Sequence, residues 1–259
     1  RRVTNVKGLA IHSGLTCSVT LHRVAGPTRF LRAGVSVPAD LDHVIGAQRA
    51  TSLGADGASV HLVEHLLAAL RIAGFYSGVL IEASADELPI LDGSAAPWVE
   101  AVAQLGAPPP PPPAIVVTSS LEVSARGGVA SAVPGPEELS YGIAFDHPAI
   151  GAQTWRGTPG TYAELLDART FGFESDWEAL KAQGMALGAS EEHAIVFLMD
   201  GPSRPLRHPL EPVRHKALDA LGDLALLGRP VFGRVSIDRG SHALHHELAR
   251  ALERSAVTE

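Results

Sequence analysis

The sequence predicts an α+β protein with two similar halves, and three observations support this fold class. Helical and strand-like segments alternate along the chain, and both halves end in the same order: helix, glycine, short apolar strand, loop and helix. A run of prolines separates the halves. An apolar fraction of 46% with 19% charged residues is typical of a packed core and excludes global disorder.

The first half, residues 1–106, is expected to form an N-terminal domain. Its predicted elements are a turn at 54–57, an apolar helix over 62–73 that ends at Gly74, a buried strand over 78–82, and a helix over 94–105 that Ser94 caps and Gly106 ends. Six consecutive prolines, Pro108 to Pro113, follow within a linker at 107–113. Prolines join neither a helix interior nor a central strand, so this segment predicts a semi-rigid spacer and a domain boundary.

The second half, residues 114–259, is expected to form a C-terminal domain. Strands are predicted over 115–117, 140–145 and 231–237, and helices over 212–227 and 241–254. Thr161 and Glu164 have the spacing of a capping box, which predicts the start of a short helix. Proline near the start of 212–227 and Gly228 just beyond its end are the expected signals of a helix.

Charge and cysteine content exclude several classes of protein. With 21 Lys and Arg against 28 Asp and Glu, the net charge of −7 leaves no basic excess for binding nucleic acid. Cys17 is the single cysteine, so neither an internal disulfide nor a zinc site of thiolates alone can form, and a reducing compartment is expected. No apolar run reaches 18 residues and no secretory leader is visible, so we expect no transmembrane segment and a cytoplasmic location.

Polar side chains interrupt two apolar helices and predict a metal site. Glu64 and His65 lie in the first of them, where a buried carboxylate is costly unless it is paired or used. In the second, His215, Asp219 and Asp223 share one face, within about 80° of arc. His65, His215 and Asp219 would give Zn²⁺ three protein ligands and leave one position open for water. Glu64 would then take a proton from that water.

Other interpretations of these residues stay open. A single His on a helix is usually an ordinary core or surface residue, and a His with a carboxylate four positions on is usually a simple helix pair. His61, Glu64 and His65 also spell H-x-x-E-H, the inverted zincin motif, in which both histidines bind zinc in a peptidase. That motif would leave the acidic face of the second helix unexplained.

Several motifs follow one another along nearly the whole chain. They are GLAIHSG at 8–14, VEHL at 63–66, LPILDGSAAP at 88–97, FDHPAI at 145–150, ARTFGF at 168–173, VRHKALDALGD at 213–223 and HAL at 242–244. In these motifs the chain resembles the UDP-3-O-acyl-N-acetylglucosamine deacetylase family, the zinc amidases of lipid A biosynthesis. The resemblance implies two similar two-layer α/β sandwich domains with the active site at their interface.

The resemblance also implies a role for each site residue. Zinc would be held by His65, His215 and Asp219, with Glu64 as the general base. Thr170 would hydrogen-bond the tetrahedral oxyanion, and Lys216 would add positive charge nearby. His242, oriented by Asp223, would stabilise the oxyanion or protonate the departing amine. A hydrophobic passage for the acyl chain would include Phe171, Phe173 and Trp177, with an insert around 172–200.

Departures from the family pattern concern the substrate. Gly128 stands where the family usually places a lysine for the nucleotide diphosphate, and Arg126 or Arg239 would have to replace that charge. Trp177 is expected to narrow the acyl passage, so a shorter acyl chain, or none, fits the sequence.

The sequence therefore predicts a zinc-dependent deacetylase that acts on a small molecule, UDP-3-O-acyl-N-acetylglucosamine, as a cytoplasmic monomer. One alternative is a related zinc deacetylase for another N-acetylated sugar or small amide. Another is a non-catalytic relative that binds a lipid or a nucleotide sugar, although such a protein would have no need of a base at Glu64.

Overall fold

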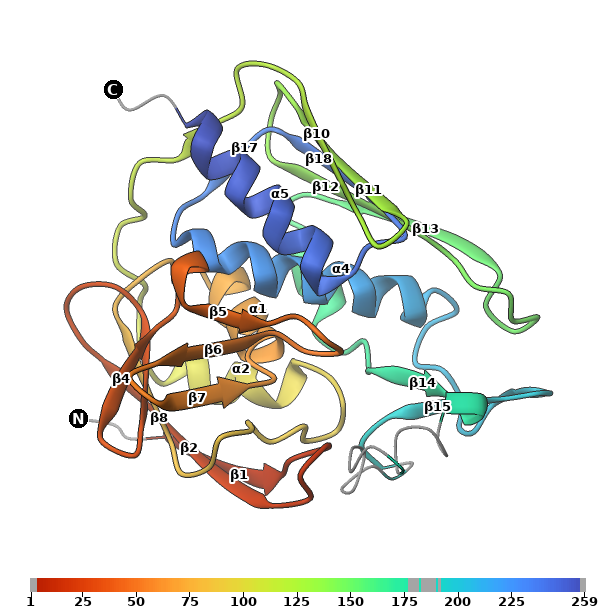
Figure 1. The fold of residues 1–259 in the computed structure, drawn as a ribbon, viewed down its shortest axis with the longest axis horizontal. Coiled ribbons are helices and arrows are strands. Elements are labelled where there is room, and N and C mark those ends of the chain that lie inside the picture. Colours follow the sequence, from red (N-terminus) through yellow and green to blue (C-terminus); the bar gives the residue numbers. More distant parts are fainter. Residues whose placement is uncertain (1–3, 177–181, 183–189, 191, 257–259) are drawn as a thin grey trace.

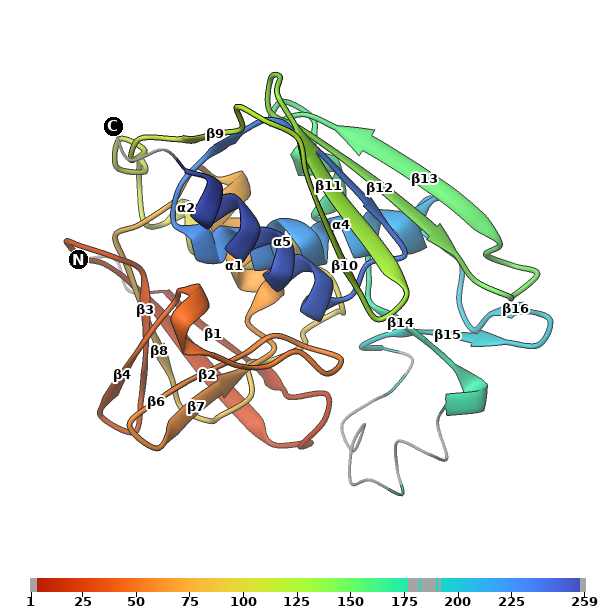
Figure 2. The same cartoon turned by 45° about the horizontal axis from the view of Figure 1, so that its top comes forward.

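Two five-stranded sheets with the same strand order form the outer layers of the protein (Figures 1 and 2). The computed structural model describes residues 4–176, 182, 190 and 192–256. The first sheet has the order β1 (Thr4–Leu9), β2 (Thr16–Arg23), β8 (Val79–Ala83), β3 (Arg29–Arg32) and β4 (Val35–Pro38). The second has the order β10 (Leu121–Ala125), β11 (Gly128–Val133), β18 (Arg234–Asp238), β12 (Glu138–Ala144) and β13 (Ala152–Gly157).

The strand that comes last in each half occupies the centre of its sheet. β8 pairs in parallel with β3 and antiparallel with β2, and β18 pairs in parallel with β12 and antiparallel with β11. In sequence each central strand lies between two helices. These are α1 (Glu64–Ile72) and α2 (Ala96–Ala103) in the first half, and α4 (Glu211–Leu224) and α5 (His242–Ser255) in the second.

The four helices lie between the two sheets, with α1 packed against α4 (Figure 2). Each half is thus a layer of strands covered by a layer of helices, and the helical layers face each other. This confirms the predicted α+β fold and the repeated order of elements. The limits of the two domains at 106 and 114 stay a prediction.

A smaller sheet is inserted at the same point of each half, after the fourth strand and before the first helix. The first consists of β5 (Val44–Gly46), β6 (Ser52–Ala55) and β7 (Ala58–His61), and the second of β14 (Phe171–Phe173), β15 (Ile195–Leu198) and β16 (Gly201–Pro202). The remaining elements are the parallel pair β9 (Ile115–Val116) with β17 (Val231–Phe232) and the short 3₁₀ helices η1 (Leu41–His43), η2 (Tyr162–Leu165) and η3 (Ala225–Leu227).

Some predicted elements have different limits in the structure. α1 begins at Glu64 rather than at 62, because Leu62 has a left-handed backbone with φ of 61°. The predicted strand over 231–237 is two strands, β17 and β18, which Gly233 separates. A β-carbon there would lie 2.5 Å from Cγ2 of Val117. The last turn of the predicted helix over 212–227 is 3₁₀, and it ends at Gly228 with φ of 59°.

The predicted capping box at Thr161 is wrong. The Thr161 hydroxyl donates to the Thr158 carbonyl and accepts from the Thr158 main-chain N–H, and η2 has no side-chain cap. The turn before the helix therefore uses the hydroxyl that a cap would need.

No helix in the described part of the chain has the length and apolar character needed to cross a membrane.

Candidate metal centre and active site

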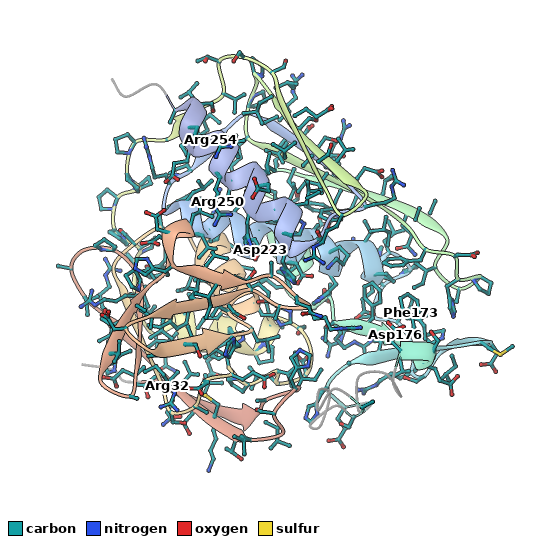
Figure 3. The ribbon with its side chains drawn as sticks, viewed as in Figure 1. Arg32, Phe173, Asp176, Asp223, Arg250 and Arg254 are labelled. Carbon is teal, nitrogen blue, oxygen red and sulfur yellow. The ribbon has the colours of Figure 1, made fainter. Side chains whose placement is uncertain are left out.

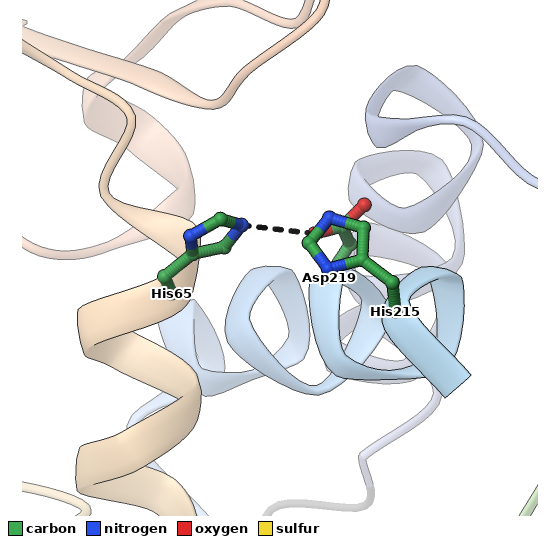
Figure 4. Close-up of side chains that lie close together, drawn as sticks. All are labelled: His65, His215 and Asp219. Carbon is green, nitrogen blue, oxygen red and sulfur yellow. Dashed lines mark ion pairs between the residues drawn. The ribbon is translucent and has the colours of Figure 1, made fainter. Parts of the chain in front are cut away.

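Three side chains from two helices that are far apart in sequence meet where α1 and α4 pack together (Figure 4). His65 comes from the first turn of α1, and His215 and Asp219 lie one turn apart on α4. Asp219 Oδ1 lies 3.3 Å from His215 Nε2 and 3.6 Å from His65 Nε2. The two imidazole rings are edge to face, with centroids 5.0 Å apart. All three side chains are buried.

Hydrogen bonds at the far side of these groups leave the facing atoms free for a metal ion. His215 Nδ1 donates to the Ala168 carbonyl at 3.0 Å, so Nε2 carries the lone pair. Asp219 Oδ2 accepts from Lys216 Nζ at 2.8 Å. Asp219 Oδ1 is buried and has no hydrogen-bond partner among the described residues. An orphaned carboxylate oxygen is costly in the interior, and a cation between it and the two Nε2 atoms would remove that cost.

Protonation states at the centre agree with this interpretation. Burial lowers the pKa of His215 to about 4, which keeps the imidazole neutral, as a metal ligand must be. Burial opposes ionisation of Asp219, but His215 and Lys216 hold the pKa of its carboxyl well below the usual value. Two imidazoles and one carboxylate are a donor set typical of a metal site that keeps a position open.

Glu64, the first residue of α1, is buried at 2% exposure and lies beside the metal-binding group. Its Oε2 accepts from the Thr51 main-chain N–H at 3.0 Å, and its Oε1 lies 3.8 Å from Nε2 of His242. Burial raises the pKa of the Glu64 carboxyl. Because a carboxyl with a raised pKa is a better proton acceptor once ionised, Glu64 suits the part of a general base.

His242 lies on the opposite side of the same space, at the first position of α5. Ser241 caps this helix by accepting from the Leu244 N–H at 3.3 Å. His242 Nδ1 donates to Asp223 Oδ2 at 2.7 Å, so Nε2 faces Glu64. Burial opposes the charge on His242, but the Asp223 carboxylate raises its pKa to about 9. His242 is therefore an imidazolium near neutral pH and can donate a proton.

The comparisons with known proteins agree with this geometry. The family described as UDP-3-O-acyl N-acetylglycosamine deacetylase matches residues 1–254. The chain belongs to this family. Three relatives named UDP-3-O-acyl-N-acetylglucosamine deacetylase come from Thermosynechococcus vestitus, Myxococcus xanthus and Synechocystis. They are 43%, 37% and 38% identical, over 96%, 96% and 95% of this chain and 91%, 83% and 95% of their own length.

The cavity of this deacetylase-family chain has a volume of about 520 Å³ and brings together most of the predicted site residues. Its lining includes the three candidate metal ligands, and also Glu64, Thr170, Phe171, Phe173, Lys216 and His242. Phe171 and Phe173 belong to an aromatic group with Phe145, His147 and Phe197, in which neighbouring ring centroids are 5.4 to 6.2 Å apart. One end of the cavity is therefore apolar.

The position of Thr170 is fixed from both sides. Its main-chain N–H donates to the Gly93 carbonyl at 2.7 Å, and its carbonyl accepts from Ile195 at 2.9 Å. The preceding residue, Arg169, forms a buried ion pair with Glu211, with Nε to Oε1 at 2.8 Å. No local pattern indicates this pair, because its two members are 42 positions apart.

Three predicted site residues do not line the described part of the cavity. Asp223, labelled in Figure 3, is fully buried and accepts from His242 Nδ1 at 2.7 Å. Arg239 is largely exposed and pairs with Asp238 at 2.9 Å, whereas Arg126 does line the cavity. Trp177 lies outside the described residues, as does the part of the predicted insert around 172–200 that comprises 177–181, 183–189 and 191.

The inverted zincin motif does not form a site. His61 ends β7, and its ring nitrogens hydrogen-bond the hydroxyls of Ser52 and Ser59 at 2.7 and 3.1 Å. Because α1 begins only at Glu64, His61 and His65 do not share a helical turn.

Four buried residues around Asp223 escaped the sequence analysis. His245 Nδ1 donates to Asp223 Oδ2 at 2.7 Å, and the Tyr141 hydroxyl donates to His245 Nε2 at 3.0 Å. The Thr51 hydroxyl donates to Asp223 Oδ1, and His246 Nε2 donates to the Thr51 hydroxyl at 3.0 Å. A helix start rich in histidine is typical of a solvated surface, so no local signal indicates this burial.

Proposed function

We propose that this protein is a zinc-dependent deacetylase that hydrolyses the N-acetyl group of UDP-3-O-acyl-N-acetylglucosamine in lipid A biosynthesis. The main support for the proposal is Asp219 Oδ1, which has no hydrogen-bond partner among the described residues and faces Nε2 of His65 and of His215. A candidate base, Glu64, and a candidate acid, His242, lie beside this group, 3.8 Å apart. The names and the family of the relatives support the substrate class.

His65, His215 and Asp219 would hold the metal ion, and zinc fits this donor set. When bound, zinc supplies Lewis acidity, which lowers the pKa of water from about 15.7 towards 7 and polarises an amide carbonyl. Lys216 neutralises the outer oxygen of Asp219 and adds positive charge at the edge of the cavity.

Glu64 accepts the proton of the attacking water at Oε1, since its Oε2 is held by Thr51. The carbonyl carbon of the acetyl group becomes tetrahedral, and the Thr170 hydroxyl donates to the oxygen that gains charge. A preorganised donor of this kind is typically worth about 10²- to 10³-fold in rate.

His242 then donates a proton from Nε2 to the departing nitrogen, so the carbon–nitrogen bond breaks to give a neutral amine and acetic acid, which ionises to acetate on release. Asp223 holds the imidazolium by Nδ1 and keeps Nε2 directed into the cavity. Separate groups act as base and acid because an amine leaves poorly unless it is protonated.

The apolar end of the cavity, with Phe171 and Phe173, suits an acyl chain, and Arg126 suits the diphosphate. A lysine at position 128 does not fit this backbone, because a β-carbon at Gly128 would lie 2.3 Å from the Arg239 carbonyl oxygen. This feature favours a second candidate, a zinc deacetylase for another N-acetylated sugar.

We also propose that the protein is a cytoplasmic monomer, and the buried, unpaired Cys17 is consistent with a reducing compartment.

Metal analysis and an amine-release assay test the proposed metal and the proposed substrate together. We expect about one zinc per chain and release of acetate with a free amine from UDP-3-O-acyl-N-acetylglucosamine. Zinc with turnover only on a different N-acetylated sugar would select the second candidate. A protein that takes up no metal would overturn both.

A further inference from the structure

Thr51 hydrogen-bonds Glu64 and Val63 in its own half of the chain, and Asp223 and His246 in the other half. It lies just before β6, is fully buried, and belongs to neither of the helices that carry the site. Its main-chain N–H donates to Glu64 Oε2 at 3.0 Å, and its hydroxyl donates to Asp223 Oδ1 at 2.5 Å. Its carbonyl accepts from the Val63 N–H at 3.4 Å, immediately before α1.

The direction of the hydroxyl bond follows from the charge of its partner. An ionised carboxylate only accepts hydrogen bonds, so the single hydroxyl proton of Thr51 points to Asp223. The Thr51 oxygen then accepts from Nε2 of His246 at 3.0 Å, which fixes the proton of that ring on Nε2. Every polar atom of Thr51 is used.

These bonds restrict the rotation of both carboxylates. Asp223 Oδ2 already accepts from His242 and His245, and Thr51 holds Oδ1, so the carboxylate plane cannot rotate freely. On Glu64, the bond to Oε2 leaves Oε1 free, at 3.8 Å from His242 Nε2. A single residue thus restrains both the base and the group that orients the acid.

We propose that Thr51 is a positioning residue, which fixes the carboxylates of Glu64 and Asp223 relative to each other so that Glu64 Oε1 and His242 Nε2 face one reacting amide. The inference rests on the proposed function, because it assumes that these two groups exchange protons with the substrate. Thr51 itself touches neither the substrate nor the candidate metal ligands.

Replacing the hydroxyl while keeping the shape tests this role. Thr51→Val removes the hydroxyl and keeps the main-chain N–H, and Thr51→Ser keeps both. We expect kcat to fall about 10- to 100-fold in Thr51→Val, with KM and zinc content unchanged, and to recover within about threefold of the parent in Thr51→Ser. Thr161→Val is the matched control, since its hydroxyl hydrogen-bonds only with Thr158 in a surface turn.

A spectroscopic readout separates this inference from the proposed function. The Nδ1 proton of His242, in its short bond to Asp223, should give a far-downfield proton NMR signal that moves in Thr51→Val and returns in Thr51→Ser. This measurement needs no turnover, so it decides the inference even if the parent protein fails to hydrolyse the substrate. If Thr51→Val does not fold, Thr51→Ala, which leaves room for a water, replaces it in the same measurements.

Three results would overturn the role of Thr51. The first is an unchanged kcat and an unchanged His242 signal in Thr51→Val. The second is a loss of zinc or an equal loss of melting temperature and activity in both Thr51→Val and Thr51→Ser, which would mean a purely structural residue. The third is a rise in KM at constant kcat, which would place Thr51 in substrate binding.

Discussion

Gly222 of α4 lies directly against the main-chain carbonyl of Glu64, the first residue of α1. A β-carbon at position 222 would be 2.1 Å from the Glu64 carbonyl oxygen. The two helices therefore approach each other as closely as backbone atoms allow, one turn away from Asp219. This contact brings the ligand of one half within reach of the ligands of the other.

Gly222→Ala should destabilise the protein, although alanine favours a helix over glycine by about 1 kcal/mol. The added methyl group must push α1 away from α4, and overpacking of this kind costs about 1–3 kcal/mol. We expect a lower melting temperature and weaker metal retention together. Gly160→Ala is the control, since the nearest atom to its β-carbon would be 3.9 Å away. An unchanged melting temperature and metal content in Gly222→Ala would contradict the proposed contact.

Glu64→Gln should keep the metal and lose turnover. The amide retains the size of the carboxylate and its oxygen can still accept from Thr51, but it cannot take a proton from water. We expect a fall in kcat of about 10²- to 10⁴-fold at unchanged zinc content, measured by amine release and elemental analysis. Glu100→Gln, on the exposed face of α2, should behave as the parent. A full rate in Glu64→Gln would remove Glu64 from the mechanism.

Asp219→Ala should release the metal on dialysis, because it removes the oxygen that faces both imidazoles. It also leaves the ammonium of Lys216 without its partner at 2.8 Å, so the melting temperature should fall as well. His61→Ala is the matched comparison, since the ring of His61 hydrogen-bonds the hydroxyls of Ser52 and Ser59 in the small sheet and none of the candidate ligands in the described part of the chain. Loss of zinc in His61→Ala, measured by elemental analysis, would revive the inverted zincin interpretation.

Activity should fall as the pH rises through about 9. His242 must carry the proton that it donates, and Asp223 raises its pKa to about 9 against the opposing effect of burial. A histidine whose folded pKa lies above its ordinary value of 6.5 stabilises the fold fully below 6.5, and this stability is lost as the pH rises towards 9. Denaturant unfolding between pH 6 and 10 should show this loss. In His242→Gln the alkaline fall in stability should be absent; if it persists, another group is responsible.

The sequence predicted the helices and the grouping of the three candidate metal ligands because both depend on local patterns. Glu64 and His65 are conspicuous in an apolar helix, and the four-residue spacing of His215 and Asp219 fixes their common face. The repeated order of helix, strand and helix around β8 and β18 was also visible. The edge strands β1 and β10 were not predicted, because their residues alternate only between half-buried and exposed and form no apolar run like that of β8.

The surroundings of Asp223 could not be predicted in the same way. Tyr141 comes from β12, so its contact with His245 exists only once the second half has folded, and the contact of Thr51 with Asp223 exists only once both halves have packed. His245 and His246 resemble polar residues of a solvated helix, yet both are buried in the folded protein. The same holds for Gly222, whose importance comes from a contact with the other half of the chain rather than from the conformation of its own backbone.

The division of the candidate ligands between α1 and α4 has a thermodynamic consequence. An ion bound by His65, His215 and Asp219 would act as a reversible cross-link that closes a long loop of chain. Because His65 comes from one half and His215 and Asp219 come from the other, cohesion of the halves and affinity for this ion are reciprocally linked. A substitution that strains the contact between α1 and α4 should therefore weaken cation binding. Removal of the ion by a chelator should in turn lower the unfolding temperature.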